Sequence, residues 1–514
     1  MTTTDPSADL RRSAYLLLIA VSVAIAAAKV VGAENVFEPS RYASPIPGGY
    51  GLEPDRKWPA TRPDPTMMMS SNDRSRWATV RALVDDGTYS IGRRVYPDAS
   101  DPNQFKPEGI VAEEAYKSLD IVLRPLTDEE KAKGGPITKE FYSSKPPLFA
   151  TMLAGEYWVL KQAFGWSIVA ERWPVMVTIL LTVNVLPFAI YLVLLSRLIE
   201  LTGKTDFGRL LAFTTAGVGT FLTTFSGTLN NHLPAAFCVL FAAYPLLMAM
   251  AERREITPCG YLASGFFAGL AATFELPSAA FLAGVGVPLL IARPKRTLLL
   301  FVPAALVPIV GLFACNFAAL GQLMPAYGEF GGPWYDFVGS HWAKRGTPAA
   351  KGIDFNNEPT TVYAFHLLFG HHGWFGLTPV WLIGLAGLVM LGVRCAEDVQ
   401  RLFRRSPGAV WSPALFSAMT LAVSLAVFAF YLSRTQSYNY GGNTSGPRWL
   451  FWLIPLWVLA VPTGADRLTC CRAGRVFAAV LLGASVLSVF YPGWNPWRPP
   501  WIMQMLEFTG VKRY

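Results

Sequence analysis

The chain has 514 residues, of which 52% are hydrophobic and only 15% are charged. Soluble globular proteins carry about 25% charged residues, so this composition indicates a protein embedded in lipid. The net charge of +9 would suit a nucleic-acid partner. However, outside the first large loop the basic residues occupy short links between apolar runs, as topology determinants do. We therefore expect no nucleic-acid partner.

The six cysteines lie in apolar runs or basic links and never in the large polar loops. A disulfide framework needs paired cysteines in the part of the chain that faces an oxidising compartment. We therefore expect that the outer part of the protein is not held together by disulfides.

The first apolar run extends from Ala14 to Ala33, within an N-terminal unit of residues 1–33. About twenty residues of helix are long enough to cross a hydrocarbon core of about 30 Å. The run is longer than the apolar segment of a signal peptide, and many further runs follow it. We therefore predict an uncleaved first transmembrane helix.

Together with about ten further apolar runs, this helix predicts an all-α polytopic membrane protein with about eleven transmembrane helices. The further runs fall into two groups, residues 172–320 with the second to seventh spans and residues 374–491 with the eighth to eleventh. The predicted spans are 173–196, 210–229, 233–251, 259–274, 276–292, 297–320, 374–393, 409–432, 449–463 and 475–491.

Short basic links such as Arg253-Arg254 all fall on one side of the membrane if the N-terminus is cytoplasmic, as the positive-inside rule requires. The functional face of the protein is then the outer one, toward the periplasm, and the protein belongs to the cell (inner or plasma) membrane. Three large polar segments lie on that face: the loop 34–171, the loop 321–373 and the tail 492–514.

The loop 34–171 contains several predicted elements. Ser75 to Val84 has apolar residues at helical spacing with arginines between them, which predicts a helix in the membrane interface. Tyr89 to Val95 is a candidate short strand, and the charged, aperiodic residues 97–139 form a predicted surface insertion. Residues 148–165 are an apolar run that follows two prolines and contains two charged residues, which predicts an interfacial helix rather than a span.

Two charged residues of this loop are candidates for chemistry. Asp73 precedes the interfacial helix, where partial desolvation strengthens a carboxylate as a base for an acceptor hydroxyl. A helix N-cap explains the same residue equally well. Lys145 precedes two prolines, and its cation on a stiff backbone suits a lipid-linked phosphate. An ordinary lysine that snorkels toward the headgroups is the alternative.

Arg172 and Arg448 begin spans on the outer side, against the usual bias of basic residues. A guanidinium binds phosphate through two donors, so both are candidates for a phosphate clamp, with headgroup anchoring as the alternative. Glu275 lies between two short apolar runs. An ionisable residue at membrane depth marks either a functional site or a buried polar contact between helices.

His366, His371 and His372 are compatible with a zinc site, but their spacing matches no established zinc motif and a fourth ligand is not evident. We expect no cofactor, with a divalent metal as the alternative. A glycine-rich polar turn around Tyr440 would suit a sugar, or equally an ordinary hairpin. The candidates for substrate binding are Arg76, Asn231, His232, Glu275, His372 and Tyr440.

The order of these features resembles the GT-C glycosyltransferases, in the family 39-like branch of protein O-mannosyltransferases and lipid A aminoarabinose transferases. In that branch an acidic motif after the first helix leads into an amphipathic helix, and Lys-Pro-Pro or His-Pro-Pro opens a second one. Asn72-Asp73-Arg74-Ser75-Arg76-Trp77-Ala78 resembles the first motif and Lys145-Pro146-Pro147-Leu148 the second. The family's usual Asp-Glu pair is here Asn72-Asp73, so only Asp73 can inherit the acidic role. Residues 10–320 carry the resemblance, and the remainder agrees in topology only.

The resemblance implies a GT-C fold and a hexosyl- or pentosyltransferase that uses a polyprenyl-phosphate sugar as donor. The acceptor would be a lipid, a glycan or a protein. Asp73 would be the general base of an inverting reaction, and Lys145 with Arg172 or Arg448 would stabilise the departing phosphate.

The competing classes are a transporter or flippase of lipid-linked saccharides and a non-catalytic protein of polysaccharide assembly. A transporter predicts ionisable groups within spans and functional surfaces on both sides of the membrane. The polar segments of this chain are concentrated on one side, which favours the enzyme.

Overall fold

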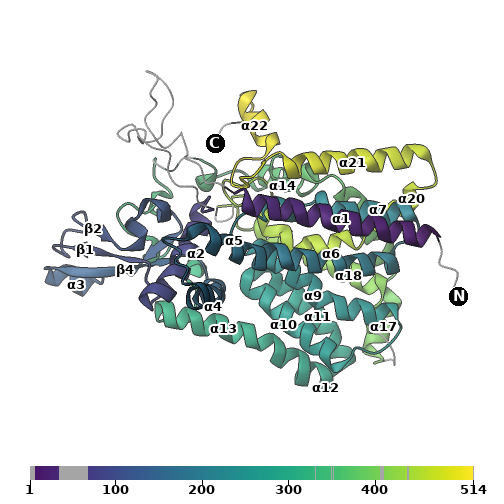
Figure 1. Ribbon diagram of the computed structural model, residues 1–514, viewed down its shortest axis with the longest axis horizontal. Helices are drawn as coiled ribbons and strands as arrows, with labels where there is room; N and C mark the ends of the chain where they lie inside the picture. Colours follow the sequence, from purple (N-terminus) through teal and green to yellow (C-terminus); the bar gives the residue numbers. More distant parts are fainter. Residues whose placement is uncertain are drawn as a thin grey trace.

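The computed structural model describes residues 6–33, 67–329, 331–348, 350, 352–405, 410–436 and 439–512. Within these ranges the protein is mostly helical and contains one small β-sheet. The long helices lie side by side along the long axis of the molecule, and the sheet lies at one end of them (Figure 1). The start of the first predicted outer loop, 34–66, lies outside the described residues.

The helices differ widely in length, and only some are long enough to cross a membrane. They are α1 (Pro6–Val31), α2 (Ser71–Arg81), α3 (Asp128–Lys133), α4 (Pro147–Phe164), α5 (Arg172–Leu180), α6 (Leu186–Thr202), α7 (Asp206–Val218), α8 (Phe221–Thr224), α9 (His232–Ala251), α10 (Pro258–Phe274), α11 (Ala279–Ala292), α12 (Pro294–Arg296), α13 (Val302–Leu320), α14 (Thr360–Leu368), α15 (Trp374–Leu377), α16 (Trp381–Gly392), α17 (Ala396–Phe403), α18 (Pro413–Leu432), α19 (Ile454–Val458), α20 (Val461–Leu468), α21 (Arg472–Phe490) and α22 (Trp501–Phe508).

Six helical segments of the described residues are long and apolar enough to span a bilayer, so the protein is a multi-pass membrane protein. A seventh span results if Arg448–Val458 and Val461–Leu468, which meet at a bend of 60°, count as one. The six segments are Ser7–Val31, Arg172–Thr202, His232–Ala251, Pro294–Leu320, Pro413–Leu432 and Arg472–Phe490.

The sequence predicted about eleven spans, whereas several of these runs form helices that are interrupted or have fewer than 18 residues. The run 276–292 forms the shorter apolar helix Leu276–Ala292, and the run 374–393 forms Trp381–Gly392. The run 210–229 is interrupted after α7, because the chain leaves the helix at Gly219 before α8 begins. Apolar content alone does not show where a helix ends or breaks, so hydropathy overestimates the number of spans.

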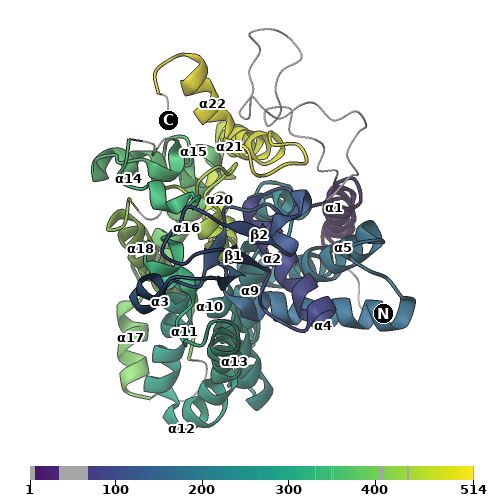
Figure 2. The ribbon, with the colours of Figure 1, turned by 90° about the vertical axis from the view of Figure 1, so that its left-hand side faces the viewer.

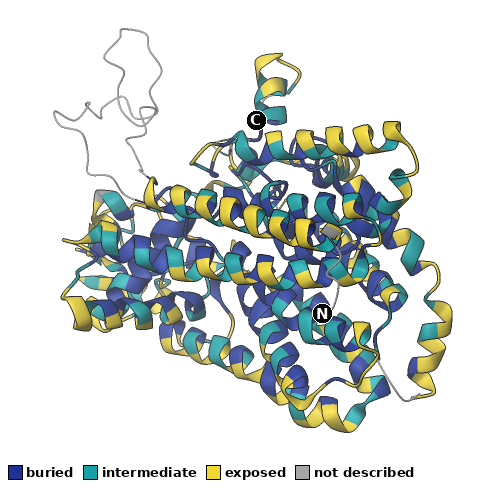
Figure 3. Ribbon diagram, turned by 45° about the vertical axis from the view of Figure 1, so that its right-hand side comes forward, coloured by how far each residue is buried: buried dark blue, intermediate teal, exposed yellow. Residues whose placement is uncertain are grey.

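Many residues on the outward faces of the long helices are exposed (Figure 3), and large apolar residues are among them. Leu299 and Val307, in the segment Pro294–Leu320 that contains α13, are 72% and 61% exposed. Val480 on α21 is 61% exposed. An apolar surface of this extent needs a covering environment, and the hydrocarbon core of a bilayer provides it.

The sheet is antiparallel, with the strand order β2-β1-β4-β3. Strand β1 (Gly92–Tyr96) confirms the strand predicted near Tyr89–Val95. The predicted surface insertion 97–139 is more ordered than expected, because it supplies β2 (Lys106–Glu108), β3 (Ile121–Leu123) and the start of β4 (Ile137–Ser143). Viewed from the sheet end, the strands and α2 lie across the ends of the bundle helices (Figure 2).

The helices α2 and α4 confirm the two helices predicted in the first outer loop. Helix α2 begins four residues earlier than expected, and its residues from Asn72 to Val80 are all buried. An interfacial helix would expose one face, but α2 packs against α4 and β4 and is covered on every side. Helix α4 also packs against α13. These contacts bring both predicted motifs to the end of the bundle.

Candidate active site

Lys145 occupies the turn between β4 and α4. Pro147 is the first residue of α4. An N–H group at this position would have no partner within the helix, so proline loses no hydrogen bond there, and its fixed φ suits a helix. Lys145 N donates to Ser143 Oγ at 3.2 Å, and Ser143 Oγ donates to Ser75 Oγ of α2 at 3.0 Å. The backbone of Lys145 is thereby tied to α2. Its side chain reaches Asp120, whose Oδ1 lies 2.8 Å from Lys145 Nζ.

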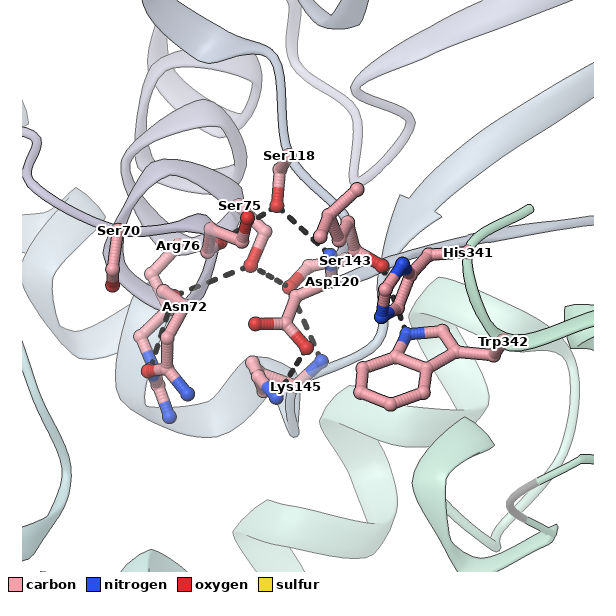
Figure 4. A network of polar contacts seen from close by, with 12 residues as sticks. Ser70, Asn72, Ser75, Arg76, Ser118, Asp120, Ser143, Lys145, His341 and Trp342 are labelled. Carbon is pink, nitrogen blue, oxygen red and sulfur yellow. Dashed lines mark hydrogen bonds and ion pairs between the residues drawn. The ribbon is translucent and has the colours of Figure 1, made fainter. Parts of the chain in front are cut away.

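Asp120 faces this lysine because of the register of two strands. Strand β3 pairs with β4 so that Ile121 lies opposite Ser143. This places Asp120 beside Ser144, whose N–H donates to the Asp120 carbonyl at 3.0 Å. Figure 4 shows the Asp120 carboxylate pointing toward Lys145. Asp120 is not among the candidates predicted from the sequence, because it lies in residues 97–139, which were predicted to be a surface insertion.

Arg76 projects from α2 toward the bundle. Its Nη1 donates to Asn72 O at 3.1 Å, and its Nη2 donates to Asn231 Oδ1 at 2.5 Å. Asn231, just before α9, in turn donates to the Phe274 carbonyl at 2.7 Å and to the carboxylate of Glu275. The outer loop is therefore connected to the ends of α9 and α10 through polar side chains that the sequence had marked as candidates.

Arg448 reaches the same group of residues from the C-terminal part of the chain. Its Nε and Nη2 donate to the Gly441 carbonyl at 3.1 and 2.8 Å, and its Nη1 donates to His232 Nε2 at 3.1 Å. The other nitrogen of that ring, His232 Nδ1, contacts the carboxyl group of Glu275. Gly441 has a φ of +95°, a conformation that glycine adopts readily and other residues do not.

Lys145, Arg76 and Arg448 form what we call the cation cluster, and the carboxylates of Asp120 and Glu275 face it. Burial lowers the pKa of Lys145, although Asp120 opposes this effect. Burial alone would raise the pKa of Asp120, but Lys145, Arg448 and Arg76 outweigh it and hold that pKa below its usual range. Burial raises the pKa of Glu275 to about 8, against the influence of the cations. The cluster therefore carries an excess of positive charge.

A narrow cleft lies beside the cation cluster. Its polar part contains Arg76 and Lys145, whereas its apolar walls include Ala150 of α4 and Leu320 of α13. The cleft has a volume of only about 10 Å³ in this state, so its lining would have to move to admit a ligand. The lining itself offers cations to one part of an amphipathic anion and hydrocarbon to the other.

Asp73, the predicted base, is fully buried. Its Oδ1 accepts from Ser70 N at 2.7 Å, and its Oδ2 accepts from Met69 N and from Thr228 Oγ1, both at 2.9 Å. Burial raises the pKa of Asp73, and the two backbone donors oppose that rise. Ser70 is the N-cap of α2, and Asp73 completes a capping box with it. The carboxylate therefore has a structural role in this state and no exposed surface toward a substrate.

Arg172 begins α5, as predicted, but it lies apart from the cation cluster. Its charge acts on Tyr116, whose pKa is raised by burial and lowered in part by Arg81 and Arg172. No hydrogen bond or ion pair within the described ranges connects Arg172 with Lys145. Of the three cations predicted to bind phosphate, the structure brings Lys145 and Arg448 together and adds Arg76 to them.

His372 and Tyr440 lie behind Arg448 rather than in the cleft. His372 Nε2 lies 3.1 Å from the Thr444 carbonyl, and its ring stacks with that of Tyr440 at a centroid distance of 5.4 Å. The Tyr440 hydroxyl donates to Glu358. Both residues therefore support the loop whose backbone binds Arg448.

The histidines that were compatible with zinc contact one another. His371 Nδ1 lies 2.6 Å from His372 Nδ1, and the rings of His366 and His371 stack at 4.0 Å. In the part of the chain that the structure describes, no three His, Cys, Asp or Glu side chains are arranged to hold a metal ion. The expectation that the protein needs no metal stays a prediction.

No protein-family model and no curated protein matches the sequence. Among solved structures, the chain is similar to the oligosaccharyltransferase of Archaeoglobus fulgidus. The complex of that enzyme with zinc and sulfate aligns with 11% identity and a TM-score of 0.44, over 94% of this chain and 53% of the other. Its complex with an inhibitory peptide and a dolichol-phosphate aligns with 12% identity and a TM-score of 0.43, over 95% and 56%. This chain thus spans about half the length of these neighbours. Identities and scores this low assign neither a family nor a fold, so the chemistry has to be inferred from the residues of this chain.

Proposed function

We propose that this protein is an integral-membrane glycosyltransferase with a GT-C architecture, in which residues 34–171 form the catalytic outer loop. It transfers a sugar from a polyprenyl-phosphate donor to a lipid, glycan or protein acceptor at the outer, periplasmic face of the membrane. The observation that carries this proposal is the convergence of Lys145, Arg76 and Arg448 beside a cleft with apolar walls.

The charge of the cluster supports an anionic ligand. Arg76 is only 3% exposed, and partly desolvated cations in excess over carboxylates are unfavourable unless an anion compensates them. A phosphate accepts hydrogen bonds from guanidinium and ammonium groups, and it binds more strongly in a site of low dielectric constant than in water. A polyprenyl phosphate supplies this anion together with a hydrocarbon chain for the apolar walls.

The same geometry supports catalysis. When the bond between the anomeric carbon and the phosphate oxygen breaks, negative charge grows on the phosphate. The cations are held by fixed contacts, Arg76 to Asn231 and Arg448 to Gly441, and preorganised charges of this kind stabilise a transition state more than a ground state. Direct attack by the acceptor hydroxyl would invert the anomeric configuration.

The test is a transfer assay with the purified protein and a panel of radiolabelled polyprenyl-phosphate sugars in lipid vesicles. We expect label to move from at least one donor to a co-reconstituted lipid, glycan or peptide acceptor, with inverted anomeric configuration in the product. Movement of intact donor across the vesicle membrane, without transfer to any acceptor, would instead identify a transporter and contradict the proposal.

A further inference from the structure

We propose that Asp120, carried by the insertion 97–139, is the catalytic residue that takes the proton from the acceptor hydroxyl. This inference rests on the proposed function and assigns the base of that reaction to a residue outside both sequence motifs. Its starting point is the contact between the Asp120 carboxylate and Lys145 Nζ at 2.8 Å, next to the cleft.

Three acidic residues approach the cation cluster, and they differ in how many fixed partners they have. Asp73 accepts hydrogen bonds from two backbone N–H groups and Thr228, and it is fully buried. Glu275 contacts Asn231 and His232 between α9 and α10. The Asp120 side chain is 14% exposed and pairs with the cation that the donor phosphate would bind.

The backbone around Asp120 is fixed, which limits the positions that its carboxylate can take. Ser118 Oγ donates to the Ser71 carbonyl at 2.6 Å and accepts from Asp120 N at 3.0 Å. On the other side, Ser144 N donates to the Asp120 carbonyl at 3.0 Å. A general base has to be positioned within hydrogen-bond distance of the proton that it takes, and these contacts position Asp120 from both α2 and β4.

Donor binding would strengthen Asp120 as a base. Three cations face its carboxylate, Lys145 at the start of α4, Arg76 on α2 and Arg448 before α19, and together they hold its pKa below the usual range. When the phosphate takes over Lys145 Nζ, Asp120 loses its closest cation and gains a neighbouring anion. Both changes raise its pKa. Asp120 is thus separated from Lys145, and able to accept a proton, only when the donor is bound.

A cleft lined by Tyr335, Asp336, Trp342 and Arg345 offers the acceptor an approach. Trp342 Nε1 donates to the carbonyl of the residue just before Asp120, Leu119, at 3.0 Å. Figure 4 shows Trp342 beside Asp120, on the opposite side from α2. An acceptor in this cleft would therefore approach Asp120 from the side of Trp342, opposite α2.

The acceptor oxygen forms a bond to the anomeric carbon while its proton moves to Asp120. The bond between the anomeric carbon and the phosphate oxygen breaks, and its electron pair leaves with the polyprenyl phosphate, which the cation cluster stabilises. After the products leave, Asp120 releases its proton to solvent and pairs again with Lys145.

The test compares Asp120→Asn with Asp128→Asn, the same substitution on the same insertion at a side chain that is 102% exposed. For Asp120→Asn we expect turnover to fall by about 10²–10⁴, the usual contribution of a general base. The Kd for a polyprenyl phosphate should stay equal or decrease, because Lys145 no longer pairs with a carboxylate. Added formate should restore part of the turnover of Asp120→Ala, and Asp128→Asn should behave like the unaltered protein.

An Asp120 that only holds Lys145 in place predicts a different pattern. Asp120→Asn would then bind polyprenyl phosphate more weakly, and formate would not restore turnover, which would overturn the inference while the proposed function stands. Asp120→Glu is the control for misfolding. It keeps the carboxylate, so it should retain more turnover than Asp120→Asn. If the unaltered protein transfers no sugar from any donor, the proposed function fails and this inference fails with it.

Discussion

Asp73 in the first turn of α2 and Asp120 just before β3 both lie at the end of the bundle, but they differ in burial and in hydrogen-bond partners. Asp73 is fully buried and accepts hydrogen bonds from two backbone N–H groups and a threonine hydroxyl. Asp120 is partly exposed and has a lysine as its closest charged partner. A carboxylate whose oxygens accept hydrogen bonds from fixed donors stabilises the fold. A carboxylate whose main partner is a cation that can bind another anion remains able to accept a proton.

After the loss expected for Asp120→Asn, the largest effect is expected at Lys145, in the turn between β4 and α4. Lys145→Ala removes a cation that faces the leaving phosphate, so turnover should fall by about 10²–10³ and donor binding should weaken. Lys145→Arg should recover part of both, because the charge is kept while the geometry differs. Sugar transfer and donor affinity, measured on folded purified variants, check this prediction. Unchanged donor affinity in Lys145→Ala would show that the phosphate binds elsewhere.

The second effect is a loss of folding stability that we expect when Asp73 is replaced. Asp73→Asn places an amide nitrogen against the N–H group of Met69 or Ser70, so at least one buried donor loses its partner. The free energy of unfolding should fall by about 1–3 kcal/mol. Denaturant unfolding of the purified protein measures this loss. The sequence-based interpretation of Asp73 as the base predicts instead a large loss of turnover per folded molecule. That result would assign the catalytic role to Asp73 rather than to Asp120.

The sequence predicted the helical class and the helices around both motifs, because long apolar runs and helical spacing are local signals. It did not predict the sheet. Strands β2 and β3 have three residues each, too few for a period to be visible, and the pairing of Gly92 with Phe141 joins distant parts of the chain. Strand pairing between residues far apart in the sequence leaves no signal in the residues next to each strand.

The candidate site was predicted as single residues and not as an arrangement. Glu275 was marked as an ionisable residue at membrane depth, Arg448 as an outer arginine against the usual bias of basic residues, and His232 as a candidate for substrate binding. The structure brings the three together. Asp73 was marked by a motif, and a motif does not indicate whether a carboxylate is accessible. Asp120 carried only a weak signal, an aspartate just before the apolar residues Ile-Val-Leu, and its role depends on the register of β3 with β4.

The third effect is a pH dependence of donor binding. Burial lowers the pKa of Lys145, and Arg76 and Arg448 lower it further, while Asp120 opposes them. The lysine contributes to phosphate binding only when protonated. Its contribution is therefore complete below the lowered pKa and is lost as the pH rises through it, at a lower pH than for an ordinary lysine, whose pKa is about 10.4.

Donor affinity measured across alkaline pH checks this prediction. The unaltered protein should lose up to about tenfold in affinity per pH unit above that pKa, which corresponds to one proton taken up with the ligand. Lys145→Arg should remove the dependence, because arginine stays charged. The same alkaline loss in Lys145→Arg would assign the dependence to another group.

The smallest expected effect is that of chelation. The two aspartates are already occupied, one by N–H groups and the other by Lys145. The ring nitrogens of His371 and His372 face each other, and His372 also contacts the Thr444 carbonyl. We therefore expect sugar transfer to be unchanged within error after treatment with EDTA and removal of the chelator. Loss of transfer that zinc or manganese restores would contradict this expectation. It would then show that at least one of these carboxylates or histidines leaves its present partners to bind a metal when the substrates are present.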